Sequence, residues 1–158
     1  MAWALSILAL AAVALFIAGQ AGLLKGTPPT NLGLRDGRLK PPAKTPNSVS
    51  SQADLWPDHP RLEQARIAPL QAGPDAATAM ARIRALVAAT PDTAIVTERP
   101  DYLYATYTTR WLRFTDDVEF WFDGTVVQVR SASRIGHGDR GVNRARIEAL
   151  RAQLAQGG

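Results

Sequence analysis

The chain begins with an apolar run: residues 1–24 carry no charged side chain, and Lys25 ends the run. A helix rises about 1.5 Å per residue, so about 23 residues reach about 35 Å, enough to cross a bilayer core of roughly 30 Å. A cleaved signal would instead start with basic residues and end in a small-x-small site, for which Gly19-Gln20-Ala21 is only passable. We expect an uncleaved single-pass anchor over residues 1–24, with a cleaved signal as the alternative.

The next segment, residues 25–60, is rich in proline. Proline lacks the backbone N–H and fixes φ, so this segment excludes a long helix or a central strand. It predicts an extended linker laid over, or leading to, the domain that follows. The prolines are Pro28, Pro29, Pro41, Pro42, Pro46, Pro57 and Pro60.

Two later segments have helical periodicity. The first segment, residues 75–90, begins with Asp75, a good N-cap, and stops before Pro91. Residues 143–155 form the second segment, with Asn143 as the expected cap. The apolar positions at helical spacing are Ala76, Ala79, Met80, Ile83, Leu86 and Val87 in the first, and Ile147, Leu150 and Leu154 in the second.

Between the helices the pattern changes to that of strands. The dipeptide Asp123-Gly124 is a strong signal for a two-residue hairpin turn. The fold class is therefore α+β: residues 61–156 should form an antiparallel sheet of about four strands with two helices packed on one face. The expected strands are Thr93–Thr97, Tyr102–Trp111, Val118–Phe122 and Thr125–Val129.

A two-residue turn at 123–124 would fix the hairpin register. It predicts that Phe120 faces Val127 on an apolar face that meets the core. On the other face it predicts that Asp117 and Arg130 are direct cross-strand neighbours.

Composition narrows the candidate chemistry. The chain of 158 residues has a net charge of +4 and no cysteine. Its length is sufficient for one domain. The absence of cysteine excludes disulfides, thiolate metal sites and catalysis by a cysteine nucleophile. Nucleic-acid binding is not expected, because Trp111, Trp121 and the tyrosines accompany the acidic strands and leave the basic residues without a stacking platform.

A glycine-rich loop, Gly136-x-Gly138-x-x-Gly141, lies between the last strand and the last helix. It matches a dinucleotide-binding pattern in form, but only 17 residues follow Gly141, too few for the second parallel strand that this fold needs. Free N–H groups at such a loop suit an anion. The alternative is structural: the nearby arginines pair with Asp116, Asp117 and Glu119 and fix the loop to the sheet.

No catalytic, metal or cofactor site is expected. His59 and His137 are the only histidines, and no spacing suggests a metal site. Asp116 and Asp117 would point to opposite faces of the sheet, which argues against a shared-proton dyad.

Three stretches resemble the domain of unknown function 1499 family, over roughly residues 32–152. They are Leu32-Gly33-Leu34-Arg35-Asp36-Gly37-Arg38-Leu39 with Pro46-Asn47-Ser48-Val49-Ser50-Ser51-Gln52; Asp116-Asp117-Val118-Glu119-Phe120; and Val129 to Gly136 with Asp139, Gly141, Asn143 and Arg146. The resemblance implies an envelope or organelle-lumen protein with no established activity. It also implies a Cys pair in relatives, which Ser48 and a position near Pro42 replace here.

These observations predict one polar, Arg-rich cleft for an anionic ligand or partner. We expect a non-enzymatic binding or assembly module that is membrane-anchored through residues 1–24 and takes an anionic small molecule or an envelope protein partner. The alternatives are a hydrolase or transferase acting on an envelope metabolite, and a structural accessory subunit of a membrane complex. The candidate ligand-binding residues are Asn47, Ser50, Ser51, Asp117, Glu119, Arg130, Ser131, Ser133, Arg134, Gly136, Asp139 and Asn143.

Two arguments about location disagree. Basic residues follow the apolar run and none precedes it, which by the positive-inside rule keeps the domain cytoplasmic. The Cys pair implied for relatives indicates an oxidising compartment. We expect an inner-membrane protein with its domain on the periplasmic side.

Overall fold

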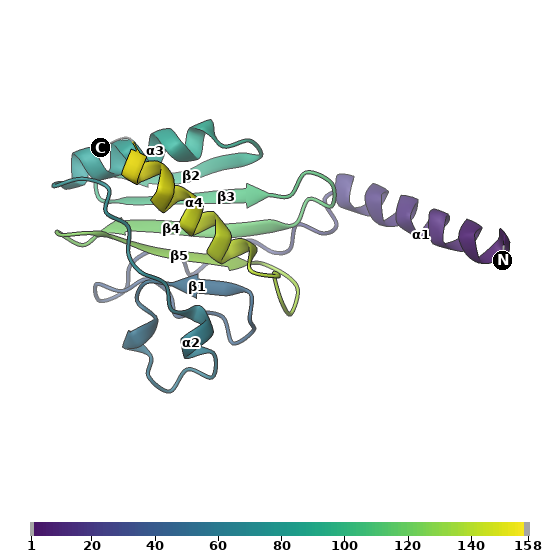
Figure 1. The fold of residues 1–158 in the computed structure, drawn as a ribbon, viewed down its shortest axis with the longest axis horizontal. Helices are drawn as coiled ribbons and strands as arrows, with labels where there is room; N and C mark the ends of the chain where they lie inside the picture. Colours follow the sequence, from purple (N-terminus) through teal and green to yellow (C-terminus); the bar gives the residue numbers. More distant parts are fainter. Residues whose placement is uncertain (1, 157–158) are drawn as a thin grey trace.

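The computed structural model describes residues 2–156 as an apolar helix followed by an α+β domain (Figure 1). The elements in chain order are α1 (Ala2–Gln20), β1 (Ser48–Ser50), a 3-10 turn (Ala53–Leu55), α2 (Leu62–Ala65), α3 (Ala76–Ala89), β2 (Thr93–Arg99), β3 (Tyr102–Thr108), β4 (Thr115–Phe122), β5 (Val127–Ser133) and α4 (Val142–Gln156). The predicted fold class is confirmed.

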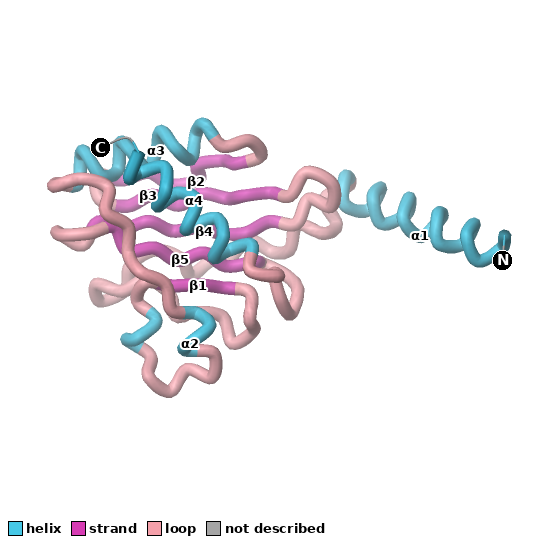
Figure 2. The backbone as a smooth tube through the Cα atoms, in the orientation of Figure 1, coloured by secondary structure: helices cyan, strands magenta, loops and turns pink. Residues whose placement is uncertain are grey.

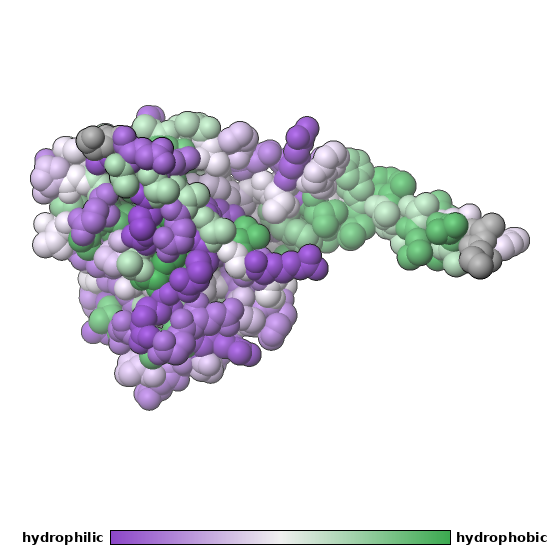
Figure 3. All heavy atoms as spheres, in the orientation of Figure 1, coloured by the Kyte–Doolittle hydropathy of each residue, from purple (hydrophilic) through white to green (hydrophobic). Residues whose placement is uncertain are grey.

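Helix α1 projects from the domain, and on the face seen in Figure 3 its surface is apolar whereas that of the domain is largely polar. None of its 19 residues has an acidic or basic side chain. At about 1.5 Å per residue it is about 28 Å long. Its length and composition fit a membrane span or a signal sequence.

The sheet has five antiparallel strands in the order β1-β5-β4-β3-β2, one more than expected. The additional strand, β1, comes from the proline-rich segment, so the sheet includes residues that precede residue 61. Its three residues are too few, and two of them too polar, to give a strand signal in the sequence. Antiparallel pairing of Val49 with Ser131 places it at the edge beside β5.

The β4–β5 hairpin has a four-residue loop, and the predicted two-residue turn is wrong. The Asp123 carboxylate accepts hydrogen bonds from the backbone N–H groups of Thr125 and Val126, which holds residues 123–126 as the loop. Phe122 therefore pairs with Val127. The register moves by two residues, which keeps every side chain on its predicted face.

The same shift changes the partner of Arg130. Its direct cross-strand neighbour is Glu119, and Asp117 lies opposite Ala132. The expected Asp117–Arg130 pair is thus replaced by a Glu119–Arg130 pair.

One face of the sheet packs against α3 and α4, which lie in front of it in Figures 1 and 2. The predicted apolar positions form this core: Ile83 and Val87 of α3, and Ile147 of α4, are fully buried against Phe120. The core contributes the main stabilisation because it removes a continuous apolar surface from water.

The sequence predicted the N-cap of α3 correctly and that of α4 wrongly. Asp75 caps α3 by accepting a hydrogen bond from the N–H of Thr78, as predicted. Helix α4 begins at Val142, so Asn143 lies in its first turn and does not cap it. The capping acceptor is Asp139, which binds the N–H groups of Gly141 and Asn143.

The proline-rich segment covers the opposite face of the sheet. Leu39 is buried there against Tyr102 and Tyr104 in a second, smaller apolar cluster. Gln52 accepts a hydrogen bond from the N–H of Leu39, which ties the segment to the strand region. The helices cover one face of β4 and the proline-rich segment covers the other. The acidic side chains on both faces of this strand are therefore buried.

Candidate functional site

The twelve predicted site residues are divided between the two faces of the sheet. Side chains alternate along a strand, so neighbours in sequence point to opposite faces. The helix-side cluster contains Asn47, Ser131, Ser133, Asp139 and Asn143, with Gly136 in the adjoining loop; the outer face carries Ser50, Asp117, Glu119, Arg130 and Arg134. Ser51 binds the edge of β5, where its hydroxyl accepts a hydrogen bond from the N–H of Val129.

Asn143 is the centre of the helix-side cluster and is completely buried. Its side-chain amide donates to the carbonyl of Asn47 at 3.0 Å, to the hydroxyl of Ser133 at 3.0 Å and to Asp139 at 2.8 Å. Asn47 in turn donates to the carbonyl of Gly136 at 2.8 Å. These bonds join the start of β1, the end of β5 and the glycine loop.

Arg146 belongs to the same cluster, although no site role was predicted for it. Its guanidinium donates to Asp116 at 2.6 Å, to Ser131 at 3.0 Å and to Asn143 at 2.8 Å. It also lies over the ring of Tyr107, 4.6 Å from the centroid. The spacing of Asn143 and Arg146, three residues apart on a helix, was the sequence signal that could have linked them.

On the outer face, Asp117 binds Arg134. The carboxylate accepts from Nε at 3.0 and 3.1 Å and from Nη2 at 2.8 Å. Tyr104 also donates to Asp117, and burial together with that bond raises the pKa of Tyr104 to about 12. The hydrogen bonds to Asp117 raise the pKa of Arg134.

The second outer-face acid, Glu119, is completely buried. Its Oε1 accepts from the N–H of Gly33 at 2.7 Å and from the hydroxyl of Tyr102 at 2.8 Å, while Oε2 makes no hydrogen bond among the described residues. The nearest guanidinium nitrogen of Arg130 is 3.8 Å from Oε2. Burial raises the pKa of Glu119 above its ordinary value of 4.5.

A cavity of about 250 Å³, the outer-face pocket, lies between the proline-rich segment and the sheet. Arg130 lines it, and Nε of this residue donates to the carbonyl of Pro41. Its two terminal nitrogens make no hydrogen bond among the described residues. The lining residues are Thr27, Pro29, Lys40, Pro41, Pro42, Ala43, Asp117, Arg130, Ala132, Ser133 and Arg134.

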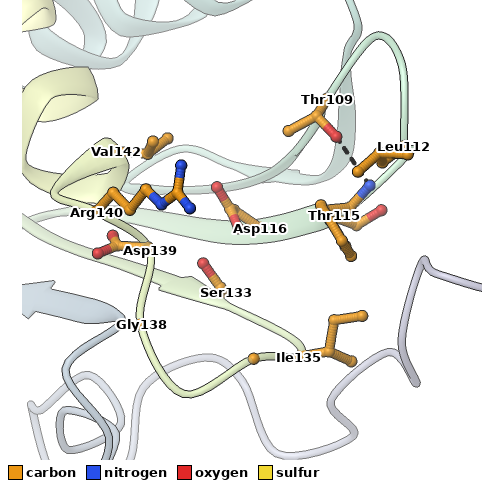
Figure 4. A pocket seen from close by; sticks show the side chains of 12 residues that line it. Thr109, Leu112, Thr115, Asp116, Ser133, Ile135, Gly138, Asp139, Arg140 and Val142 are labelled. Atoms are coloured by element: carbon orange, nitrogen blue, oxygen red, sulfur yellow. Dashed lines mark hydrogen bonds between the residues drawn. The ribbon is translucent and has the colours of Figure 1, made fainter. Parts of the chain in front are cut away.

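A larger cavity of about 420 Å³, the junction pocket, lies between the β3–β4 loop and the glycine loop (Figure 4). It combines apolar and charged side chains. Its lining residues are Thr109, Leu112, Phe114, Thr115, Asp116, Ser133, Ile135, Gly136, Gly138, Asp139, Arg140 and Val142. The predicted strand Tyr102–Trp111 ends at Thr108, which frees residues 109–114 to form one wall of this pocket.

Metal-binding groups are not gathered anywhere in residues 2–156: no group of three or more His, Asp or Glu side chains could hold an ion. Arginine, tyrosine or backbone N–H groups bind each of the candidate carboxylates, which are Asp116, Asp117, Glu119 and Asp139. His137 lies on the exposed part of the glycine loop.

These features define a small α+β domain with buried ion pairs, joined to an apolar N-terminal helix. Residues 38–154 match the model of a protein family that is described as a protein of unknown function (DUF1499). The chain belongs to this family. No curated protein and no solved structure matched the chain.

The implied Cys positions of relatives are occupied differently here. The Ser48 hydroxyl accepts a hydrogen bond from the N–H of Ala43, the residue next to Pro42. The two segments are therefore joined by a hydrogen bond in this chain.

Proposed function

We propose that this protein is a membrane-anchored, non-enzymatic binding module of the cell envelope, whose outer-face pocket takes an anionic group. The observation that carries the proposal is Arg130. Its side chain is 5% exposed, yet its two terminal nitrogens have only the ion pair with Glu119 at 3.8 Å. A buried guanidinium with open donors favours a ligand that accepts hydrogen bonds.

The charges around this pocket support an anion. Asp117 is already bound by Arg134, so the remaining lining charges are Arg130 and Lys40, both positive. The pKa of Lys40 is lowered first by burial and then by repulsion from the nearby Arg130. A carboxylate or phosphate between them would relieve this repulsion and provide two acceptors in the plane of the guanidinium.

The enzymatic alternative has less support. Glu119 has the raised pKa of a general base, but it is completely buried and does not line the outer-face pocket. A base must reach the proton that it abstracts. We therefore assign the pocket to binding.

Contacts of α1 with the domain support an anchor that is retained. The Gln20 side chain donates to the carbonyl of Trp111 at 3.0 Å, and a Cβ on Gly19 would lie 2.8 Å from the carbonyl oxygen of Leu112. Both residues belong to the weak cleavage site, and their fit to the domain is explained if the helix stays. The mass of the protein extracted from membranes would decide between residue 1 and a start near residue 22.

We place the domain on the periplasmic side of the inner membrane. Because the chain has no cysteine, the single variant Gln71→Cys, at an exposed position, would report its side unambiguously. A membrane-impermeant maleimide should label it in intact spheroplasts. Labelling that occurs only after lysis would show that the domain lies in the cytoplasm. The basic residues after α1 favour that side by the positive-inside rule.

The binding test uses the full chain in detergent micelles with inorganic phosphate and with succinate. A ligand at about 100 times its Kd should stabilise by about 2.7 kcal/mol, a rise of several degrees in melting temperature. The rise should be lost in Lys40→Ala and Arg130→Gln and retained in Lys44→Ala, whose side chain is exposed nearby. No rise with either anion, or an equal rise in Lys40→Ala, would overturn the proposal.

A further inference from the structure

We infer that the junction pocket binds the headgroup of a zwitterionic phospholipid, one that carries both a phosphate and an ammonium group, drawn from the bilayer beside α1. This site differs from the outer-face pocket in position and in the residues that would carry recognition. It rests on the anchoring part of the proposed function and not on anion binding by Arg130.

The first step is the position of the β3–β4 loop, residues 109–114, against the end of α1 (Figure 1). Gln20 donates to the carbonyls of Arg110 and Trp111. The ring of Phe16 lies 6.2 Å from that of Trp111. The loop therefore lies alongside the last turn of the helix.

The second step is the depth of this loop in a membrane. The apolar stretch Trp3–Gln20 has 18 residues, and at about 1.5 Å per residue it spans about 27 Å, close to the thickness of the hydrocarbon core. Its last turn then reaches the headgroup level. Trp111 is 65% exposed at this level, as expected of an interfacial tryptophan. Lys25 and Arg110 add positive charge where lipid phosphates lie.

The third step is the arrangement of polarity within the pocket. Figure 4 shows Leu112 and Ile135 at one end, and Asp116, Asp139 and Arg140 toward the other. The apolar end adjoins the anchor and the residues directly after it: the backbone of Leu112 lies against Gly19, and a Cβ on Gly26 would lie 2.7 Å from the Ile135 side chain. A lipid entering from the bilayer would thus meet apolar walls first and charged groups further in.

The fourth step is a carboxylate oxygen and a guanidinium without hydrogen-bond partners at the polar end, among the residues that the structure describes. Asp116 is more than nine-tenths buried, with Oδ2 bound to Arg146 and Oδ1 without a hydrogen bond among the described residues. The guanidinium of Arg140 makes no hydrogen bond or ion pair with any residue that the structure describes. An ammonium fits Asp116, and a phosphate fits Arg140. A cavity of about 420 Å³ is in the range of small-molecule sites.

The test titrates the full chain in detergent micelles with two short-chain lipids, dihexanoyl phosphatidylethanolamine and dihexanoyl phosphatidylglycerol. The first carries both charges, and the second carries the phosphate alone. Native mass spectrometry measures the bound fraction. We expect the ethanolamine lipid to bind at least 10-fold more tightly, and Arg140→Gln to weaken it at least 10-fold. Arg61→Gln, an exposed arginine outside the pocket lining and away from the β3–β4 loop, should change affinity by less than twofold.

Further variants separate binding from folding. Asp116→Asn removes the negative charge that attracts the ammonium group and should abolish the preference between the two lipids, but it also weakens the Arg146 pair. Ile135→Trp fills the apolar end at a partly exposed position and should reduce the binding of both lipids. Equal affinity for the two lipids in the wild type, or unchanged affinity in Arg140→Gln, would overturn the inference. Arg140→Gln should keep the response to phosphate or succinate, so the two proposals fail independently.

Discussion

Arg134 and Asp117 are joined by three hydrogen bonds between one guanidinium and one carboxylate, with the shortest at 2.8 Å. Their side chains are 9% and 4% exposed. The pair connects the start of the glycine loop to the middle of the sheet. Arg134 is therefore occupied within the protein, which favours a structural role for this arginine over the direct binding of a ligand.

Replacing Arg134 with alanine should destabilise the protein without unfolding it outright. Asp117 would remain buried with only Tyr104 as a partner, which typically costs about 3 kcal/mol. For a chain of this size that is a fall of about 6–12 °C in melting temperature. Thermal unfolding of the full chain in detergent would measure it, with Arg61→Ala, an exposed arginine without a side-chain partner among the described residues, as the control. Equal melting temperatures for the two variants would contradict the structural role.

Glu119 should make stability fall as the pH rises. Its folded pKa is raised by burial, so between 4.5 and that raised value the folded state binds more protons than the unfolded state. The free energy of unfolding of the wild type, relative to Glu119→Gln, should therefore decrease above pH 4.5 and level off once the folded pKa is passed. Denaturant titrations from pH 4 to pH 8 would measure this difference. A difference that stays constant across the range would show that folding does not raise the pKa of Glu119.

Asn143→Ala should be among the most destabilising single substitutions in the domain. It removes bonds to three segments and leaves the Asn47 carbonyl and the Ser131 hydroxyl buried with fewer partners. We expect a loss of about 2–4 kcal/mol, seen as a lower denaturant midpoint at an unchanged slope. The exposed Asn31→Ala, which removes one bond from Lys40, should change stability by less than about 0.5 kcal/mol. A small effect at Asn143 would mean that water replaces its bonds.

Gly19→Leu should separate the anchor from the β3–β4 loop. A Cβ at residue 19 would lie 2.8 Å from a backbone oxygen of Leu112, so one of the two elements must move. Loop amides of Arg113 and Phe114, which are hydrogen-bonded to Thr109, should then exchange with deuterium at least about 5-fold faster. Ala12→Leu, on the exposed part of α1, is the matched control. Unchanged exchange in Gly19→Leu would indicate that the helix and the loop are not packed in solution.

The sequence predicted the elements whose signal is local. Helix α3, with its cap at Asp75 and its apolar stripe through Ile83, follows from periodicity and a following proline. The face assignment of β4 also follows, because alternation alone puts Phe120 on one side and Glu119 on the other. The family resemblance rested on short motifs, and the match over residues 38–154 confirms it.

Other features depended on contacts between distant segments. The polar motif at Asn47 could not be recognised as a strand edge until β5 was placed beside it. The two-residue error in the hairpin register arose because Asp123-Gly124 signals a turn, whereas the extra hydrogen bonds of the Asp123 carboxylate set its length. Only that register shows that Arg130 lies beside Glu119.

The amino-acid sequence alone was sufficient for the order of the longer helices and strands, for the apolar N-terminal helix and for the kinds of polar residue near the last loop. The folded arrangement was needed to show that those residues form two clusters on opposite faces, with Asp117 on one side and Ser133 on the other. The reason is physical. Periodicity assigns a side chain to a face, but whether that face meets a helix, a proline-rich segment or a cavity depends on elements far away in the chain.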